Sequence, residues 1–362
     1  WLVTMLLLVT AMAMPKMAWA ETYDQNGFAK DGSYQPATLT TDQYDINGDG
    51  TIDEVYEIGN AGQLYWFAAL VNGKLTDGTS QNRNACAVLV SNITVNKNLL
   101  NSLDNNGYPT GTVTIDSWTP FGDYISSYYD GLDYLGIFDG NGHSISGLYC
   151  KQPNAKNISF CGYMTKGTIK NVAIIDSYFE GDYNVGGIVG ASNESAIKNC
   201  LFCGTVKSNK RVGGICGAIQ GYSTISDCFS NAQILVVENA NNYCGGICGM
   251  GYGQKIKLRN CVYNNSLYSG QVIKWVEEYE NDVTWTGTVE HITGMKTAEI
   301  ASGKATHWLN RYHSGDGLGW YQNIDNGQTN DAYPVLDNTH GVVYTSQPCP
   351  SSGKFSNNKS SL

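Results

Sequence analysis

The feature that most restricts the fold of this chain is a Gly-rich hexapeptide that occurs three times. The copies are Val185-Gly-Gly-Ile-Val-Gly190, Val212-Gly-Gly-Ile-Cys-Gly217 and Cys244-Gly-Gly-Ile-Cys-Gly249, which begin 27 and 32 residues apart. Each copy is followed by a second repeated segment, and these are Ile197-Lys-Asn-Cys-Leu-Phe202, Ile225-Ser-Asp-Cys-Phe-Ser230 and Leu258-Arg-Asn-Cys-Val-Tyr263. A unit that recurs at this period indicates a stacked repeat architecture.

Apolar and polar residues alternate within each unit, which is typical of short strands broken by Gly, Asn and Asp. One unit cannot bury its own apolar face, but units stacked about 4.8 Å apart bury it against one another. We therefore predict an all-β fold, a right-handed parallel β-helix (solenoid) with short helical caps at its ends. The alternative is an antiparallel sandwich with Gly-rich hairpins, which does not require the same hexapeptide three times.

Stacking of equivalent positions predicts rows of side chains inside the solenoid. One predicted row is Val172, Cys200, Cys228 and Cys261, and a second is Val189, Cys216 and Cys248. Cysteines that recur in this way favour buried free thiols over a disulfide framework. The paired glycines of the hexapeptide are expected to turn the chain at a corner, where positive φ is often needed.

Composition excludes several classes of function. The net charge is −10 and charged residues make up only 15% of the chain, so we expect no nucleic-acid partner. A coiled coil or helix bundle would need more Ala, Glu, Lys and Leu. Hydrophobic residues make up 42% of the chain, which argues against disorder.

The first 20 residues are predicted to be a secretory signal peptide. Residues 2–14 are apolar, and Ala18-Trp19-Ala20 is a small-x-small cleavage signature before Glu21. The apolar run is shorter than the roughly 20 residues of a membrane span. The mature protein is therefore expected to have no membrane span and to be secreted or to lie on the cell surface.

The rest of the chain divides into three parts. Residues 21–55 form an N-terminal segment with a candidate calcium loop, residues 56–345 form the β-helix with its caps, and residues 346–362 form a linker or tail. A first helix is predicted to begin after Asn60, with Gln63 completing a capping box, and to end at Asn72-Gly73. A second helix is predicted from Thr297 to Leu309, interrupted at Gly303.

The hexapeptides resemble those of the GLUG-motif proteins, which are exported bacterial β-helical proteins. Further segments resemble the same group, namely Tyr56-Glu-Ile-Gly-Asn-Ala-Gly-Gln-Leu-Tyr-Trp-Phe-Ala-Ala-Leu-Val-Asn72, Trp118-Thr-Pro-Phe-Gly122, Phe138-Asp-Gly-Asn-Gly-His-Ser-Ile-Ser-Gly-Leu148 and Tyr333-Pro-Val-Leu336. The resemblance implies a secreted or surface-exposed protein, often an adhesin-like or accessory region. Some members are peptidases with an attached zinc domain, but this sequence contains no His-Glu-x-x-His, so that activity is not carried over.

Residues 45–53 form the best local motif for a metal. Asp45, Asn47 and Asp49 occupy positions 1, 3 and 5 of an EF-hand-like loop, Thr51 occupies position 7 and Asp53 position 9. Hard oxygen ligands at alternate positions suit Ca²⁺, although position 12 lacks the usual carboxylate. Ca²⁺ is therefore the one candidate cofactor, and the alternative is a solvated polar turn.

The segment from Asp123 to Tyr134 is aromatic and acidic and interrupts two family-like segments. Its rings could stack on sugars while its carboxylates accept hydroxyl hydrogen bonds. The candidate ligand-binding residues are Tyr124, Tyr128, Tyr129, Asp130, Asp133 and Tyr134. The alternative is a tyrosine-rich loop packed on the first coil.

We assign no catalytic residues from the sequence. Asp139, Asn141 and His143 lie in an Asp-Gly-Asn-Gly turn that is common in the resembled group without catalysis. We predict an exported, non-catalytic β-helix for adhesion or recognition, directed at an extracellular glycan or a host surface. The alternatives are a carbohydrate-active β-helical enzyme, which would need two facing carboxylates, and a structural stalk for a further domain.

Overall fold

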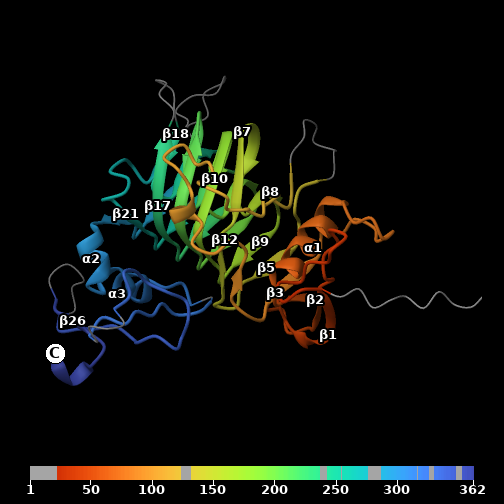
Figure 1. Ribbon diagram of the computed structural model, residues 1–362. Helices are drawn as coiled ribbons and strands as arrows, with labels where there is room; N and C mark the ends of the chain where they lie inside the picture. Colours follow the sequence, from red (N-terminus) through yellow and green to blue (C-terminus); the bar gives the residue numbers. More distant parts are fainter. Residues whose placement is uncertain are drawn as a thin grey trace, which may run out of the picture.

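The computed structural model describes residues 23–123, 132–236, 243–253, 255–275, 287–315, 317–325, 330–347 and 353–362. The chain forms a parallel β-solenoid of about eight turns, which confirms the predicted fold class (Figure 1). Successive coils add strands to three sheets that run along the solenoid. The predicted signal peptide lies outside the described residues.

The nine-stranded sheet has the order β1-β2-β3-β5-β9-β12-β16-β20-β23. Its strands are β1 Thr38–Tyr44, β2 Asp53–Ile58, β3 Cys86–Leu89, β5 Ile137–Asp139, β9 Thr168–Lys170, β12 Ala196–Lys198, β16 Thr224–Ser226, β20 Lys257–Arg259 and β23 Thr288–Glu290. Strands β1 and β2 pair antiparallel, and from β2 onward the neighbours are parallel. The first coil therefore begins at β2, Asp53–Ile58, which spans the boundary predicted between residues 55 and 56.

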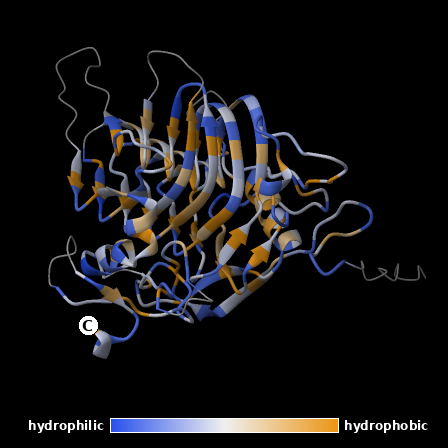
Figure 2. Cartoon of the chain, turned by 60° about the vertical axis from the view of Figure 1, so that its left-hand side comes forward, coloured by the Kyte–Doolittle hydropathy of each residue, from blue (hydrophilic) through white to orange (hydrophobic). Residues whose placement is uncertain are grey.

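The ten-stranded sheet has the main order β18-β14-β10-β13-β17-β21-β24, with β4, β6 and β7 alongside β10. Its strands are β4 Ile93–Thr94, β6 Ser144–Ser146, β7 Tyr149–Ile158, β10 Ala173–Gly186, β13 Leu201–Ser208, β14 Arg211–Gly213, β17 Phe229–Val236, β18 Tyr243–Gly245, β21 Val262–Asn264 and β24 Thr293–Met295. The five-stranded sheet consists of β22 Ile273–Trp275, β19 Cys248–Tyr252, β15 Cys216–Gln220, β11 Val189–Asn193 and β8 Cys161–Thr165. The hydropathy colouring alternates along the strands (Figure 2), as expected where one face is buried.

The interior rows lie where the sequence predicted them. Val172, Cys200, Cys228 and Cys261 are all fully buried in one core cluster, and Val189 pairs with Cys216, which pairs with Cys248. The thiols of Cys200, Cys228 and Cys261 each donate to the carbonyl two residues earlier, at 3.1, 3.1 and 3.2 Å. Every cysteine that the structure describes is free. Cysteine therefore suits the row because it fills the core and satisfies a backbone acceptor.

The paired glycines stack as predicted but for a different reason. Gly186 pairs with Gly213, which pairs with Gly245, yet none of the glycine pairs has positive φ. A Cβ on Gly213 would lie 2.1 Å from the Cys216 carbonyl oxygen, and one on Gly187 would lie 2.1 Å from the Phe202 ring. Close backbone approach, and not a left-handed conformation, excludes other residues here.

Asparagine and aspartate supply the positive φ at the corners. Between the nine- and ten-stranded sheets, Asn171, Asn199, Asp227 and Asn260 have φ of 56°, 51°, 55° and 48°. Their side chains bond from coil to coil, as from Asn199 Nδ2 to Asn171 Oδ1 at 2.9 Å. A short polar side chain tolerates the left-handed region and can also form such a ladder.

Helix α1, Ala61–Asn72, closes the N-terminal end of the solenoid interior (Figure 1). The Asn60 side chain accepts from Gln63 N, and Gly73 ends the helix with φ 64°, as predicted. The Gln63 side chain reaches back to Gly59 N at 2.8 Å, one residue earlier than a capping box requires. The ring of Phe67 packs against Phe121 and Phe138 of the first coils.

The C-terminal segment lies along the flank of the ten-stranded sheet. It contains α2 Thr297–Ala301 and α3 Lys304–Arg311, separated at Gly303 as predicted. Leu309, Trp320 and Leu336 pack on a row of outward-facing strand residues, namely Ala173, Leu201, Phe229 and Val262. The other short elements are β25 Tyr344–Thr345, β26 Phe355–Ser356, and the 3₁₀ helices η1 Leu100–Ser102 and η2 Lys359–Ser361.

The predicted tail is not extended in its described part. Strand β26 pairs antiparallel with β25, and Ser356 is buried. Asn357 Nδ2 donates to the carbonyls of Gln322 and Val342 at 2.7 and 3.0 Å. Residues 353–362 therefore complete the C-terminal segment, because their backbone and amide groups have partners within it.

Candidate functional site

The outer face of the five-stranded sheet carries a cluster of tyrosines over small residues, which we call the tyrosine platform. In register along the coils lie Tyr163, Ala191, Ala218, Met250 and Lys274. A second row, two residues further along each strand, is Thr165, Asn193, Gln220 and Tyr252. Tyr163, Tyr243 and Tyr252 are half-buried and pack around Ala191, Ala218 and Met250, separately from the main core.

The geometry of the platform comes from its small residues. Ala191 and Ala218 leave room for the Tyr163 ring to lie along the stack, where its hydroxyl accepts from Gln220 Nε2 at 2.8 Å, two coils away. Lys274 Nζ lies 5.1 Å from the centre of the Tyr243 ring. The face therefore combines partly exposed aromatic rings with amide and hydroxyl groups. It is a surface that can stack on a ring and hydrogen-bond its substituents.

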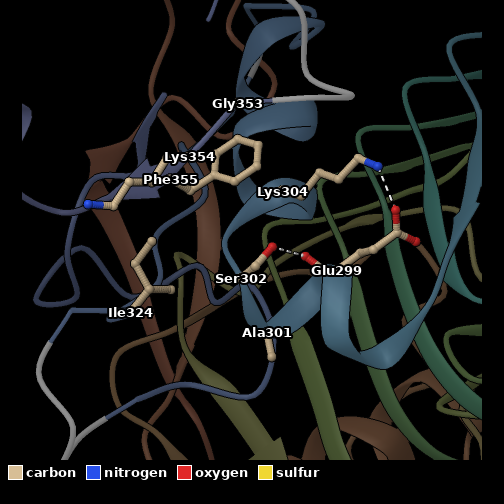
Figure 3. Close-up of a pocket in the computed structure, with 8 residues that line it drawn as sticks. All are labelled: Glu299, Ala301, Ser302, Lys304, Ile324, Gly353, Lys354 and Phe355. Atoms are coloured by element: carbon tan, nitrogen blue, oxygen red, sulfur yellow. Dashed lines mark hydrogen bonds and ion pairs between the residues drawn. The ribbon is translucent and has the colours of Figure 1, made fainter. Parts of the chain in front are cut away.

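A hollow of about 490 Å³ lies in the C-terminal segment (Figure 3). Ile324 and Phe355 line one side, and Glu299 and Lys304 lie on the other. The Lys304 ammonium bonds Glu299 at 2.6 Å, and Ser302 Oγ donates to the Glu299 carbonyl at 2.7 Å. Glu299 and Lys304 thus bind each other across one side of the hollow, and we assign it to packing within the segment.

The predicted calcium loop is the exposed connection between β1 and β2. Asn47 Nδ2 lies 3.1 Å from Asp49 Oδ2 and 3.3 Å from Asp53 Oδ1, so these side chains converge. The Asp45 carboxylate accepts from the amides of residues 48–50. Hydrogen bonds from the Thr51 side chain and backbone lower the pKa of Asp49. Both a metal loop and a polar turn use such contacts, so calcium binding stays a prediction.

The structure corrects the predicted ligand-binding set at Tyr134. This residue is fully buried and its hydroxyl donates to the Ala85 carbonyl at 2.9 Å, so it belongs to the core and offers no ring to a ligand. Burial raises the pKa of Tyr134 well above its usual value. Asp133 forms an ion pair with Arg83. Tyr124, Tyr128, Tyr129 and Asp130 lie outside the described residues.

The Asp139–His143 segment is a turn, as predicted. The His143 amide donates to the Gly140 carbonyl at 2.8 Å, and Asn141 and Gly142 have φ of 49° and 84°. Asp139 Oδ2 lies 3.4 Å from Lys170 Nζ, and its Oδ1 accepts from Asn171 at 3.0 Å. Burial lowers the pKa of His143. Asp139 therefore accepts the first hydrogen bond of the ladder that continues through Asn171 and Asn199.

Sequence reasoning missed the platform because its members are not alike. Tyr163, Ala191, Ala218 and Met250 share a row only once the coils are set in register. The available signal was the position after the last Gly of each hexapeptide, which is Ala191, Ala218 and Met250. Aligning the repeats through that position would have revealed the row, although not the rings beside it.

Comparisons with known proteins give limited matches. No family model matches the chain, so the GLUG resemblance stays a prediction. The chain is 27% identical over 183 residues to Halomucin of Haloquadratum walsbyi, covering 50% of this chain and 2% of that protein. A solved structure from Bacteroides ovatus, named "putative immunoglobulin A1 protease", aligns with a TM-score of 0.38 and 18% identity over 78% of this chain and 92% of that one. Within the part of the chain that the structure describes, no helix is long and apolar enough to span a membrane.

Proposed function

We propose that this chain is an exported, non-catalytic recognition protein of the cell surface that binds glycans on the tyrosine platform. The observation that carries the proposal is the packing of Tyr163, Tyr243 and Tyr252 around Ala191 and Ala218 on the outer face of a sheet. An aromatic ring with a polar tip suits a sugar, which has an apolar ring face and hydroxyl edges. Gln220 and Asn193 add amide donors and acceptors in the next row.

The spacing of the coils supports an extended ligand. Equivalent residues repeat at the strand separation of about 4.8 Å, which is close to the length of one pyranose unit in an extended polysaccharide. A solenoid is also a rigid scaffold, so the rings are held in place before a ligand arrives. An extended glycan that lies along the stack would therefore meet a different group of the platform at each coil.

The cellular location is supported by the predicted signal peptide at residues 1–20, which implies export. The similarity to Halomucin covers half of this chain but only 2% of that protein. Adhesion through glycans is consistent with that location, and the enzyme and stalk alternatives gain no specific support from the platform.

A glycan array with residues 21–362 tests the proposal. We expect binding by the unaltered chain, and about tenfold weaker binding for Tyr243→Ala and for Tyr252→Ala, because each removes one ring from the platform. The matched control is Tyr108→Ala, which removes a 55% exposed tyrosine outside the platform. Thermal unfolding of all variants shows whether the platform changes alter stability.

Two outcomes contradict the proposal as a whole, and a third contradicts the platform as its site. One is an array without signal for the unaltered, folded chain. The other is binding that Tyr243→Ala and Tyr252→Ala leave unchanged, which would place glycan recognition elsewhere. Equal loss in Tyr108→Ala would also remove the platform from the argument.

A further inference from the structure

A second corner of the solenoid lies inside the ten-stranded sheet, where β10 passes from its pairing with β13 to its pairing with β14, and it gathers positive charge in an acidic protein. Tyr183 of β10 lies opposite Lys156 of β7, and the register of Val185 with Val212 places it opposite Lys210 as well. Lys156, Lys210 and Arg211 surround its ring, at 5.9, 5.6 and 4.1 Å from the centre. We call these residues, with Tyr243 and Lys274, the basic corner.

The basic corner is held in place by an amide ladder. Asn157 and Asn184 both have φ of 57°, and Asn184 Nδ2 donates to Asn157 Oδ1 at 2.9 Å. Arg211 follows in the next coil, 3.5 Å from Asn184 Oδ1, and pairs in register with Tyr243. The Arg211 guanidinium is thus oriented over the Tyr183 ring by the same device that builds the turn. Its position is fixed by the fold and does not depend on a ligand.

Two lysines of this corner, Lys156 and Lys210, have no carboxylate partner among the residues described. Both are exposed. The nearby carboxylates are Asp182, whose Oδ1 accepts from Asn209 at 3.0 Å, and Asp123 on the rim beside Lys156. Cations held around one ring repel each other, and an anion placed among them would relieve that repulsion.

The corner adjoins both a hollow and the tyrosine platform. A hollow of about 300 Å³ is lined by Gln152, Lys156 and Asn157, beside Pro120 and Asp123. At the other end, Tyr243 belongs to the basic corner and also packs against the platform, and Lys274 lies 5.1 Å from its ring. One extended ligand could therefore run from the hollow, past the cations, to the tyrosines.

We infer that the ligand of this face is an acidic polysaccharide whose carboxylate or sulfate groups meet the basic corner. The inference rests on the proposed glycan function and adds the chemical class of the ligand. Sugar rings would contact the platform, while the anionic substituents would lie within reach of Lys156, Lys210 and Arg211. Nucleic acid is the alternative polyanion, and we favour an acidic polysaccharide because its sugar rings also fit the proposed use of the tyrosine platform.

The test compares polysaccharides that differ in charge but share a backbone. Binding of the folded chain is measured for dextran sulfate against dextran, and for polygalacturonate against its methyl ester, at low and high salt. We expect at least about tenfold tighter binding of a charged member over its neutral partner. Raising the salt should reduce that difference, because exposed ion pairs are screened. Single-stranded DNA of similar length is included as a third polyanion.

The matched variants remove two charges at two places. Lys156→Gln with Lys210→Gln acts on the basic corner, and Lys257→Gln with Arg259→Gln acts on exposed residues of β20 in the nine-stranded sheet. Both variants make the same change in net charge. For the first variant we expect about tenfold weaker binding of the acidic polysaccharide, because two exposed ion pairs with the ligand are lost. For the second variant we expect little change in binding.

Each outcome decides a separate point. Binding of neutral polysaccharides alone overturns the inference and leaves the glycan function standing. No binding to any polysaccharide overturns both. Equal weakening by the two variants shows an effect of net charge and overturns the basic corner as the site, and DNA binding of similar strength overturns the assignment to polysaccharides.

Discussion

Two corners of the solenoid, one at the border of the nine- and ten-stranded sheets and one inside the ten-stranded sheet, use the same backbone device but differ in what covers them. At the covered corner, Asn171, Asn199, Asp227 and Asn260 form an amide ladder that is almost fully buried. The C-terminal segment closes over it, through Leu318, Ser314 and Leu309. The basic corner repeats the ladder with Asn157 and Asn184, but its next positions are Arg211 and Tyr243.

The difference separates structural repeats from recognition. In Figure 1 the C-terminal segment, drawn in blue, lies at the lower left, whereas strands β7 and β18 reach the top of the view. The residues that follow the ladder are buried at both corners, in the Val172, Cys200, Cys228 and Cys261 row at the covered corner and as Ile158, Val185 and Val212 at the basic corner. The basic corner differs because the side chains beside its ladder include the exposed Lys156 and Lys210. The same turn geometry therefore supports packing on one side and leaves groups for binding on the other.

The largest effect expected from this comparison is alkaline destabilisation through the thiol rows. Burial raises the pKa of Cys150 to about 12, and raises that of Cys161, Cys228, Cys248 and Cys261 well above the usual value. The unfolded chain ionises first, near the ordinary thiol pKa of about 8.5. Stability is therefore full below that pH and is lost as the pH rises above it, by about 1.4 kcal/mol per pH unit for each buried thiol.

Urea unfolding in reducing buffer between about pH 8 and pH 11 measures this loss. The matched variant is Cys228→Val, since Val172 occupies the same row naturally. At pH 7 we expect Cys228→Val to cost less than about 1.5 kcal/mol, as for a volume-conserving change. Its free energy of unfolding should also fall less steeply with pH, and the slope should differ from that of the unaltered chain by the contribution of one thiol. A slope that Cys228→Val leaves unchanged would mean that this thiol ionises equally in both states.

The second effect separates the two ladders directly. Asp227 is fully buried and accepts from Asn260 Nδ2 at 2.6 Å and from Ser314 Oγ at 2.6 Å. We expect Asp227→Ala to lower the free energy of unfolding by about 3–5 kcal/mol, because it leaves buried donors unpaired and puts Ala in the left-handed region. The equivalent change at the basic corner, Asn184→Ala, should cost less, about 1–3 kcal/mol, because, although Asn184 is buried with φ 57°, its loss breaks an amide hydrogen bond to Asn157 and leaves no group of a covering segment unpaired. Equal losses in chemical denaturation would contradict the distinction between a covered and an open corner.

A third, smaller effect follows from the break that Asp227 makes in its ladder. Each Asn donates to the preceding coil, but Asp227 has no amide, and Asn199 Oδ1 is buried without a partner among the described residues. Asp227→Asn would supply that donor while its oxygen still accepts from Asn260 or Ser314. We expect a change in stability within about 1 kcal/mol, far from the loss in Asp227→Ala. A loss as large as that of Asp227→Ala would show that the carboxylate itself is required to hold Ser314.

The sequence predicted the covered side of this molecule better than the open side. Identical hexapeptides and the Asn-Cys or Asp-Cys steps specify register, and register places Cys200, Cys228 and Cys261 in one row. Helix α1 was readable from Asn60 and Gly73, because capping depends on local residue types. Interior packing repeats the same physical requirement in every coil, so it leaves a repeated pattern in the sequence.

The open side carries no such repetition. Lys156, Tyr183 and Lys210 occupy one position in three coils and have no common residue type. They are close only because the coils stack. The coils contain insertions of different length, so these positions are not evenly spaced in the sequence and are recognised as equivalent only after the coils are aligned. Tyr134 was misassigned for the related reason that an aromatic residue in an insertion can be either a surface ring or part of the core.

The last expected effect concerns the loop at residues 45–53, which lies next to the nine-stranded sheet. Lys170 Nζ of β9 donates to the Ile46 carbonyl at 2.7 Å, so the loop is anchored to a coil. If Asp45, Asn47, Asp49, Thr51 and Asp53 bind Ca²⁺, about 10 mM calcium should raise stability by about 1–3 kcal/mol, given the millimolar affinity typical of extracellular calcium sites. Thermal unfolding with calcium, with magnesium and with chelator measures the shift.

Asp49→Ala should abolish the calcium response, whereas Asp77→Ala, which removes a similar exposed Asp-x-Thr turn contact, should keep it. Because ligand binding adds to stability only through the native loop, an equal response in both variants would assign the calcium effect to another part of the chain and leave residues 45–53 as a polar turn.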